Sequence, residues 1–401
     1  MRRVGARKIF NLLRRIWRWR GKMKVEDLRK IAVLGAGVMG HGIAQVAAVA
    51  GYTVAMRDIS EEILERAVGN IKRSLERLVR RGRLSEEDVE AALSRIRTTL
   101  DLREAVGDAG LVIEAVPEKL DLKKRVFKEV EEAAPERAVL ASNTSSLSIT
   151  EIAEAVEDPG RVVGMHFFNP PVIMRLVEVV PGERTSRETV EFALDFVKKL
   201  GKTPVLVKKD SPGFIVNRVL VPYLNEAAKM VDRGEAEVLE IDSAMQFKAR
   251  FPMGPFLLSD LIGIDIVHHI LKVFEEKLGP FYKPAESIER LYREGKLGRK
   301  TGEGFYNYRE GRPQVPEEAG RGFDVNRLLA LMVNEAAKVV SEGVAEIEDV
   351  DTAMKLGANL PEGPFEAARR IGVGRLTEVL RELEERYGEG YAPSPLLSSL
   401  K

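Results

Sequence analysis

The feature that most constrains the fold is a glycine-rich turn between an apolar run and a helical pattern. Residues 30–34 read KIAVL, residues 35–40 read GAGVMG and residues 43–50 read IAQVAAVA. This order predicts a strand, a G-x-G-x-x-G turn and a helix, which together form the phosphate-binding corner of a dinucleotide-binding βαβ unit. The helix N-terminus then faces the phosphate charge. We therefore expect six residues to bind the cofactor: Gly35, Ala36, Gly37, Val38, Met39 and Gly40.

An acidic residue after the next apolar run strengthens this prediction. Residues 52–56 read YTVAM, and Asp58 lies 23 positions beyond Gly35. This is close to the roughly 20 expected for the acid that binds the adenosine ribose. Its carboxylate would repel a 2′-phosphate, so NAD is favoured over NADP, although the neighbouring Arg57 weakens that preference. The alternative is a glycine turn in an ordinary βαβ unit.

Composition is typical of a soluble, globular protein of two or three domains, because 401 residues are enough for several cores and 44% of them are hydrophobic. The absence of cysteine excludes disulfides and thiolate metal sites. No metal cluster is visible in the sequence, and no apolar run is long enough to span a bilayer. We expect a cytoplasmic protein that holds no metal.

The first 22 residues carry a charge unlike that of the rest. They contain nine basic residues and no acidic one, and the remaining residues hold 54 Lys and Arg against 62 Asp and Glu, a net charge of −8. The main part of the chain is therefore not expected to bind nucleic acid. The segment is open to three interpretations: a basic amphipathic helix on a membrane or partner, a targeting segment, or an upstream artefact or disordered tail with synthesis starting at Met23.

Polar residues follow several further predicted strands of the first half. Residues 111–116 form an apolar strand that ends near Glu118, and residues 138–141 form another that ends at SNTSS, residues 142–146. Ligands bind at the ends of strands in a doubly wound sheet. Small polar residues there can approach a cofactor, but an N-cap for a helix at residues 149–156 is an equally good interpretation.

A histidine and a glutamate lie on two neighbouring predicted strands. His166 ends the strand at residues 161–165, and Glu178 lies among β-branched residues in the strand at residues 176–180. A buried carboxylate needs a partner, and pairing with a carboxylate orients a histidine that acts as a general base. The alternative is a histidine with a structural role only.

A long amphipathic helix is predicted between the second and third strands. Its apolar residues recur at three- and four-residue spacing over residues 61–81, and its opposite face is basic around Lys72. A solvated face is one interpretation. The other is a landing site for an anionic nucleotide tail on the substrate.

The second half of the chain contains only helical patterns, and they repeat. After a last strand at residues 203–207, Ser211 and Pro212 are predicted as the N-cap and first residue of a helix. The string NEAAK occurs at residues 225–229 and 334–338, and GPF occurs at residues 254–256 and 363–365, both 109 positions apart. A constant offset indicates internal duplication, and the copies would pack about a pseudo-two-fold axis in place of a homodimer contact.

These patterns predict an α/β Rossmann-type domain followed by an all-α region of two tandem homologous helical domains. The predicted divisions are a basic N-terminal extension (1–28), an NAD-binding domain (29–210), a first helical copy (211–310), a linker (311–322) and a truncated second copy (323–401).

The combined motifs resemble the (S)-3-hydroxyacyl-CoA dehydrogenase family, including its 3-hydroxybutyryl-CoA dehydrogenases, over about residues 29–308. Besides the glycine turn with Asp58, the matching strings are ASNTSSL (141–147), HFFNP (166–170), LVEV (176–179), PGFIVNR (212–218) and KTGEGFY (300–306). The second copy resembles the repeated C-terminal domain of larger, multifunctional members.

The resemblance implies a role for each matching residue. His166 would be the base that takes the 3-hydroxyl proton, Glu178 would orient it, Ser145 would hydrogen-bond the reacting oxygen, and Asn217 would reach the substrate. Contacts with NAD are implied for Glu118, Lys123, Asn143, Asn169 and Lys300. The basic helix around Lys72 matches the element that faces CoA.

The implied activity is NAD-dependent oxidation of (S)-3-hydroxyacyl-CoA to 3-oxoacyl-CoA and its reverse, in fatty acid β-oxidation or 3-hydroxybutyryl-CoA metabolism. The alternatives are a dehydrogenase of a non-CoA 3-hydroxy acid and a non-catalytic NAD-binding relative. Many duplicated relatives carry an enoyl-CoA hydratase module that this chain lacks, so a separate hydratase is a candidate partner. The duplication implies a monomer with a pseudo-dimeric core.

Overall fold

The computed structural model describes residues 23–400. The interpretations of residues 1–22 lie outside this range. The chain divides into two compact units, one ending at Pro204 and the other beginning at Val205.

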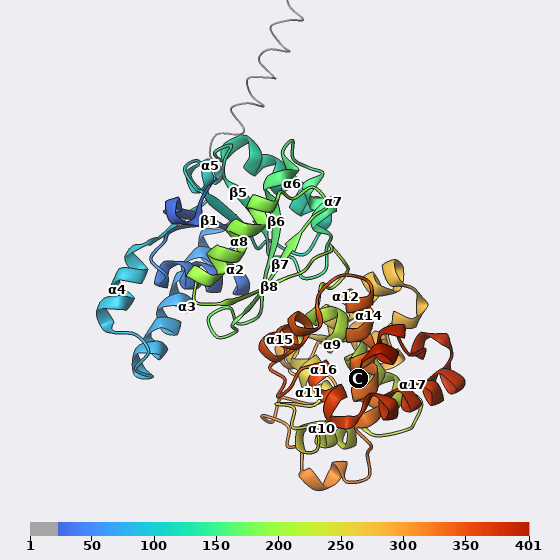
Figure 1. Ribbon diagram of the computed structural model, residues 1–401. Coiled ribbons are helices and arrows are strands. Elements are labelled where there is room, and N and C mark those ends of the chain that lie inside the picture. Colours follow the sequence, from blue (N-terminus) through green and yellow to red (C-terminus); the bar gives the residue numbers. More distant parts are fainter. Residues whose placement is uncertain (1–22, 401) are drawn as a thin grey trace, which may run out of the picture. The chain divides into compact units, whose positions relative to one another are not determined.

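The first unit is built on one eight-stranded sheet with the order β3-β2-β1-β4-β5-β6-β7-β8 (Figure 1). Neighbouring strands from β3 to β6 are parallel, and β7 runs antiparallel to β6. This confirms the predicted Rossmann-type domain. The strands are β1 Lys30–Leu34, β2 Thr53–Arg57, β3 Ile96–Thr99, β4 Leu111–Glu114, β5 Val139–Ser142, β6 Val162–Phe167, β7 Leu176–Pro181 and β8 Thr203–Leu206.

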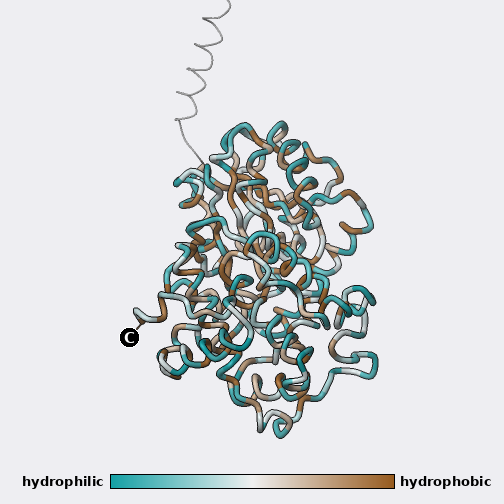
Figure 2. Tube along the Cα trace, turned by 90° about the vertical axis from the view of Figure 1, so that its right-hand side faces the viewer, coloured by the Kyte–Doolittle hydropathy of each residue, from teal (hydrophilic) through white to brown (hydrophobic). Residues whose placement is uncertain are grey.

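Helices pack on both faces of this sheet (Figure 1). They are α2 Val38–Val49, α3 Glu61–Arg80, α4 Glu86–Ser94, α5 Leu102–Val106, α6 Leu120–Ala133, α7 Ile149–Ala153 and α8 Arg187–Lys199, with short 3₁₀ turns η1 Val25–Asp27 and η2 Pro159–Arg161. Because both faces are covered, the central strands are apolar throughout: β4, β5 and β6 are buried along their whole length. Hydrophobic and hydrophilic stretches alternate along the trace (Figure 2).

The second unit is helical. Beyond β8, the only β-structure in the described residues consists of isolated β-bridges. Its helices are α9 Val216–Asp232, α10 Val238–Phe247, α11 Pro255–Ile262, α12 Ile264–Leu278, α13 Glu286–Arg293, α14 Asn326–Ser341, α15 Ile347–Gly357, α16 Pro364–Ile371 and α17 Val373–Tyr387. Its 3₁₀ turns are η3 Pro280–Tyr282, η4 Arg299–Thr301, η5 Glu317–Gly320, η6 Glu389–Tyr391 and η7 Pro395–Ser399.

The predicted start of α9 is wrong by a few residues. The helix begins at Val216 rather than at Pro212. Gly213 and Phe214 have φ angles of +75° and +55°, and this left-handed backbone cannot continue into a helix. The PGF segment is therefore a turn that precedes the helix.

Elements of the second unit recur at the spacing predicted from the sequence. Helices α11 and α12 begin at Pro255 and Ile264, and α16 and α17 begin 109 positions later in each case. The 3₁₀ turns η3 and η6 keep the same offset. The predicted linker, residues 311–322, contains η5, whose segment packs on α10: the Ser243 hydroxyl donates to the Pro316 carbonyl at 2.7 Å.

Two reciprocal ion pairs join α9 to α14. Arg218 of α9 pairs with Glu335 of α14, and Arg327 of α14 pairs with Glu226 of α9 at 3.1 Å. Arg218 and Arg327 are 109 positions apart, and so are Glu226 and Glu335. The phenolic groups follow the same rule, because Tyr282 donates to Glu335 and Tyr391 donates to Glu226. This is the pattern of an isologous interface, in which residue i contacts j and j contacts i.

A hairpin at residues 298–308 is anchored by a buried carboxylate. Asp260 accepts hydrogen bonds from the backbone N–H groups of Phe305 and Tyr306, each at 2.9 Å. The residue 109 positions beyond Asp260 is Arg369, which lies 3.5 Å from Asp351. The carboxylate that anchors the hairpin therefore does not recur at the 109-residue offset.

Candidate functional site

The parallel strands bring the predicted first-unit residues to one edge of the sheet. Strands β1, β4, β5 and β6 all run in the same direction, so their carboxyl ends share an edge. The glycine turn follows β1, Glu118 lies beyond β4, the SNTSS segment follows β5 and His166 lies near the end of β6. This is the edge at which ligands bind in open α/β sheets.

The glycines of the turn meet different requirements. Gly35 has a φ of +95°, and a Cβ built on Gly40 would lie only 1.7 Å from the Gly35 carbonyl oxygen, so the chain itself demands glycine at both positions. Gly37 has an ordinary φ of −63°, and a Cβ there would meet no atom within 4 Å. Glycine at position 37 therefore leaves open space in front of the α2 N-terminus, which suits a close approach by phosphate.

The acid predicted to bind the ribose lies beside this turn. Asp58 follows β2, and its carboxylate accepts the backbone N–H of Ala36 at 2.7 Å. Arg57 is directed elsewhere, because its Nε donates to the Leu100 carbonyl at 3.1 Å. The exposed side chains of Val38 and Ile59 add apolar surface near Asp58 and the turn. The residues present therefore fit a dinucleotide with an unphosphorylated ribose.

The predicted histidine–glutamate pair is formed in the structure. His166 and Glu178 are directly opposite each other on antiparallel strands β6 and β7. The His166 Nδ1 lies 2.6 Å from a Glu178 carboxylate oxygen, and both side chains are buried. A carboxylate can only accept, so Nδ1 carries a proton, and in the neutral imidazole the lone pair is then on Nε2. The arrangement is that of an oriented general base.

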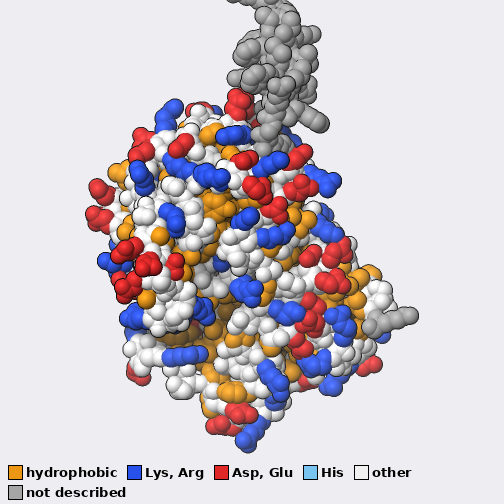
Figure 3. All heavy atoms as spheres, turned by 60° about the vertical axis from the view of Figure 1, so that its left-hand side comes forward, with side chains coloured by type: hydrophobic (Ala, Val, Ile, Leu, Met, Phe, Trp, Pro, Cys, Tyr) orange, Lys and Arg blue, Asp and Glu red, His pale blue; other side chains and the backbone are white. Residues whose placement is uncertain are grey.

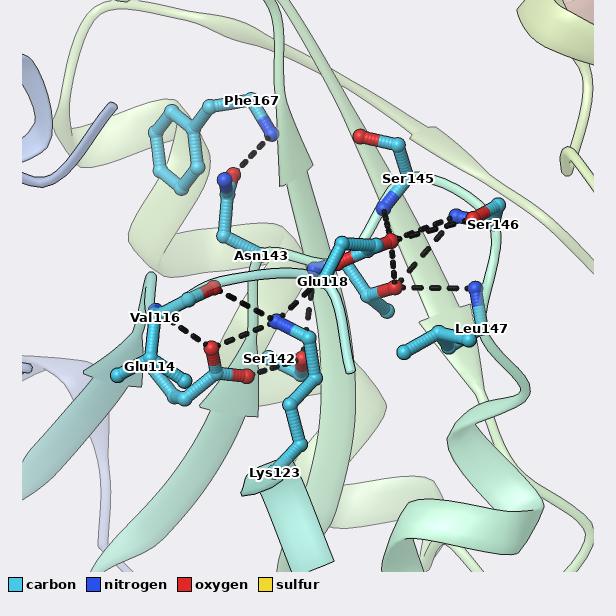
Figure 4. A network of polar contacts seen from close by, with 11 residues as sticks. Glu114, Val116, Glu118, Lys123, Ser142, Asn143, Ser145, Ser146, Leu147 and Phe167 are labelled. Carbon is cyan, nitrogen blue, oxygen red and sulfur yellow. Dashed lines mark hydrogen bonds and ion pairs between the residues drawn. The ribbon is translucent and has the colours of Figure 1, made fainter. Parts of the chain in front are cut away.

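The SNTSS segment wraps around the Glu118 carboxylate (Figure 4). Glu118 Oε1 accepts the backbone N–H groups of Ser145 at 2.9 Å and Ser146 at 3.2 Å, and it also accepts the Thr144 hydroxyl. Burial raises the pKa of Glu118, but the Lys123 ammonium, the Thr144 hydroxyl and the Ser145 N–H together lower it by more, so the pKa lies below its usual range. The Ser145 hydroxyl points away from Glu118 (Figure 4).

The N-cap interpretation of this segment is wrong. Helix α7 is capped by Ser148, whose hydroxyl accepts the Glu151 N–H at 3.1 Å. Residues 142–146 lie upstream of this cap. The N–H groups of residues 144–146 donate to Glu118 and to the Ser142 hydroxyl instead.

Lys123 is fully buried between two acids. Its Nζ lies 2.6 Å from Glu114 Oε1 and 3.2 Å from Glu118 Oε2, and the Lys123 side chain is 1% exposed. Sequence reasoning missed Glu114, the last residue of β4. An acid that ends an otherwise apolar, buried strand was the available signal, because such a carboxylate requires partners.

The two predicted asparagines lie just beyond the ends of β5 and β6. Asn143 follows β5, and its Oδ1 accepts the Phe167 N–H at 2.9 Å, which ties the SNTSS segment to β6. Asn169 is exposed in the loop after β6 and forms a cis peptide bond with Pro170. Lys202 holds that loop by donating to the Pro171 carbonyl at 2.5 Å, and burial lowers the pKa of Lys202 to about 8.

Three predicted residues lie elsewhere in the chain. Lys72 is exposed on α3, whose opposite face buries Leu64, Ala67, Ile71 and Leu75. Asn217 lies in the first turn of α9, and the Lys300 ammonium pairs with Asp265 in the first turn of α12. Acidic and basic side chains are interspersed over the face shown in Figure 3.

Within residues 23–400, no group of three or more His, Asp or Glu side chains is placed to hold a metal ion. No helix in that range combines the length and apolar character needed to cross a membrane.

The open space at Gly37 gives a direct test of the cofactor site. We expect Gly37→Val to raise the Kd for NADH by about 10- to 100-fold, because overpacking costs about 1–3 kcal/mol, while the thermal unfolding midpoint stays unchanged. NADH fluorescence titration measures the Kd. Gly374→Val in α17 is the control, since a Cβ on Gly374 also meets nothing within 4 Å. Unaltered NADH binding in Gly37→Val would place the cofactor elsewhere.

Models of two domain families match almost the whole described chain. The NAD binding domain of 3-hydroxyacyl-CoA dehydrogenase matches residues 30–211. The C-terminal domain of 3-hydroxyacyl-CoA dehydrogenase matches residues 213–308 and again residues 322–401.

Individual proteins give the same result. The mitochondrial hydroxyacyl-coenzyme A dehydrogenase of Homo sapiens is 44% identical over 289 residues, covering 70% of this chain and 92% of that protein. The 3-hydroxyadipyl-CoA dehydrogenase of Escherichia coli K12 is 33% identical over 464 residues, covering 92% of this chain and 97% of that protein. The crystal structure of 3-hydroxybutyryl-CoA dehydrogenase from Escherichia coli K12 superimposes with a TM-score of 0.86 at 33% identity, covering 93% and 98% of the two chains.

Proposed function

Because the chain belongs to the 3-hydroxyacyl-CoA dehydrogenase family, whose members use NAD, we propose that it oxidises (S)-3-hydroxyacyl-CoA to 3-oxoacyl-CoA reversibly, with His166 as the general base. The observation that carries this proposal is the buried pair of His166 and Glu178, 2.6 Å apart at the ligand-binding edge of the sheet. A purely structural role for His166 does not explain its position at the ligand-binding edge of the sheet. An ordinary glycine turn does not explain the open space at Gly37.

The side chains divide the chemistry as follows. NAD, when bound, supplies the acceptor for the hydride that leaves C3. The His166 Nε2 takes the proton of the 3-hydroxyl group as the carbonyl forms, and in reduction it returns that proton. Glu178 accepts the Nδ1–H and stabilises the positive charge that develops on the imidazole. Ser145 donates a hydrogen bond to the reacting oxygen.

The remaining assignments rest on the motif matches. Glu118, Lys123, Asn143, Asn169 and Lys300 are proposed to contribute to NAD binding, and Asn217 to contact the substrate. Lys72 and its basic neighbours on α3 are proposed to face the nucleotide end of CoA, since an exposed basic helix face attracts phosphate groups.

The test is NADH oxidation with acetoacetyl-CoA compared with free acetoacetate. We expect turnover with the CoA ester and little with the free acid. The reverse preference would favour a dehydrogenase of a non-CoA 3-hydroxy acid, and no turnover with either would favour a non-catalytic NAD-binding relative. A rate series over acyl lengths would then separate short-chain 3-hydroxybutyryl-CoA metabolism from general β-oxidation.

Partners and location follow the same reasoning. The fatty acid oxidation complex subunit alpha of Shewanella amazonensis is 36% identical over 402 residues, covering 95% of this chain but only 56% of that protein. We propose that a separate enoyl-CoA hydratase associates with this chain, that the reciprocal α9–α14 contact makes it a monomer, and that it works in the cytoplasm. Size-exclusion chromatography with light scattering measures the oligomeric state.

A further inference from the structure

The β4 terminus carries a buried carboxylate to which the proposed reaction gives no role. Glu114 is 1% exposed, and three donors converge on it. Its Oε1 accepts the Lys123 ammonium at 2.6 Å and the Val116 N–H at 2.7 Å, and its Oε2 accepts the Ser142 hydroxyl at 2.6 Å (Figure 4). A buried acid with this many donors is held in one position.

These contacts link the ends of two neighbouring strands. Glu114 and Ser142 are paired residues at the ends of β4 and β5. Val116 lies just beyond β4, and Lys123 lies in the first turn of α6. One carboxylate therefore fixes the two strand ends and the helix relative to one another.

Lys123 passes this constraint on to the SNTSS segment. Its ammonium is shared between Glu114 Oε1 and Glu118 Oε2, so Glu118 presents its other oxygen, Oε1, to the segment. That oxygen holds the backbone of Ser145 and Ser146 (Figure 4). If Glu114 lost its charge, the buried ammonium would have Glu118 as its one remaining carboxylate and would draw it away from the segment.

We propose that Glu114 is a positioning residue, which acts through Lys123 and Glu118 to hold Ser145 where it meets the reacting oxygen. This inference rests on the proposed function of Ser145. Glu114 itself does not touch the substrate.

The experiment compares two isosteric neutralisations. Glu114→Gln removes the charge from the network. Glu131→Gln is the matched control, since Glu131 also accepts two backbone N–H groups, from Glu157 at 2.7 Å and Asp158 at 3.2 Å, and pairs with Arg161 at 3.1 Å. Glu131 lies near the amino end of β6, away from the ligand-binding edge.

We expect Glu114→Gln to lower kcat by about 10- to 100-fold at saturating NADH and acetoacetyl-CoA, the usual effect of removing a group that orients a functional residue. The KM for acetoacetyl-CoA should change less than threefold, and Glu131→Gln should keep the wild-type kcat. A wild-type kcat in Glu114→Gln, or an equal loss in both variants, would overturn the proposal.

A double variant tests the route through Lys123. If Glu114 acts through that ammonium, the double variant Glu114→Gln/Lys123→Met will have a kcat within about threefold of the kcat of the worse single variant. The reason is that the effects of substitutions at coupled residues do not add. A loss of kcat in the double variant equal to the product of the two single losses would overturn this route. Should Glu114→Gln not fold, Ser142→Ala removes one donor while Glu114 keeps its ion pair with Lys123. The proposal then requires a kcat below that of the wild type in Ser142→Ala. An inactive wild type would refute the proposed function instead.

Discussion

Replacing His166 by glutamine is expected to lower kcat by about 10²- to 10⁴-fold, the range that general acid–base catalysis contributes. Glutamine cannot take the hydroxyl proton, but its side-chain amide can still donate to the buried Glu178, so the β6–β7 pair should remain folded. The Kd for NADH should stay within about twofold of wild type, because the glycine turn is untouched. Steady-state rates with acetoacetyl-CoA and a fluorescence titration measure the two quantities.

A second histidine–glutamate pair in the same chain provides the control. His268 of α12 lies 2.7 Å from Glu289, and its ring stacks on Tyr292 with centroids 4.1 Å apart. His268→Gln should therefore leave kcat unchanged. Turnover at the wild-type rate in His166→Gln would remove that residue from the mechanism, whatever the outcome for His268.

The second large effect concerns stability. We expect Arg218→Met to lower the free energy of unfolding by about 3 kcal/mol, the lower end of the range for breaking a buried ion pair. Arg218 is 2% exposed and Glu335 is 0% exposed, so within residues 23–400 the variant leaves a buried carboxylate with Lys338, at 2.7 Å, as its one cationic partner. For a unit of this size the midpoint should fall by roughly 6–12 °C. Thermal unfolding followed by circular dichroism measures it.

The reciprocal pair should respond less. Arg327 is 17% exposed, and Glu226 keeps Arg233 at 2.7 Å when Arg327 is lost, so Arg327→Met should cost about 1 kcal/mol. Equal losses in the two variants would show that the burial of Arg218 does not set the stability of the contact. No loss in either would mean that the α9–α14 ion pairs do not stabilise the second unit.

The sequence predicted those features that depend on local order along the chain. The apolar run, the three glycines and Asp58 specify the β1–α2 turn because each requirement lies within one βαβ unit. His166 and Glu178 could be paired because a buried acid among β-branched residues needs a donor, and the neighbouring strand offers one. The repeated NEAAK string located the two helices that carry the reciprocal contacts.

The remaining features depend on contacts that have no local signature. The Glu114 network joins residues from two strand ends and a helix. A single acid at the end of β4 does not indicate which residues will contact it. Arg218 meets Glu335 across 117 positions, and repetition alone does not show which side chains pair. The sequence pattern places the start of α9 too early, because proline is a common first residue of helices, whereas Gly213 and Phe214 adopt left-handed backbone.

The most direct test of His166 as the base is the pH dependence of the wild-type rate in both directions. A base must be deprotonated to oxidise the alcohol and protonated to reduce the ketone. We predict that kcat/KM for 3-hydroxybutyryl-CoA oxidation rises with pH and that kcat/KM for acetoacetyl-CoA reduction falls with pH, through one shared ionisation. The residual activity of His166→Gln should lack that ionisation. Profiles that change in the same direction, or a shared ionisation that survives in His166→Gln, would contradict the assignment.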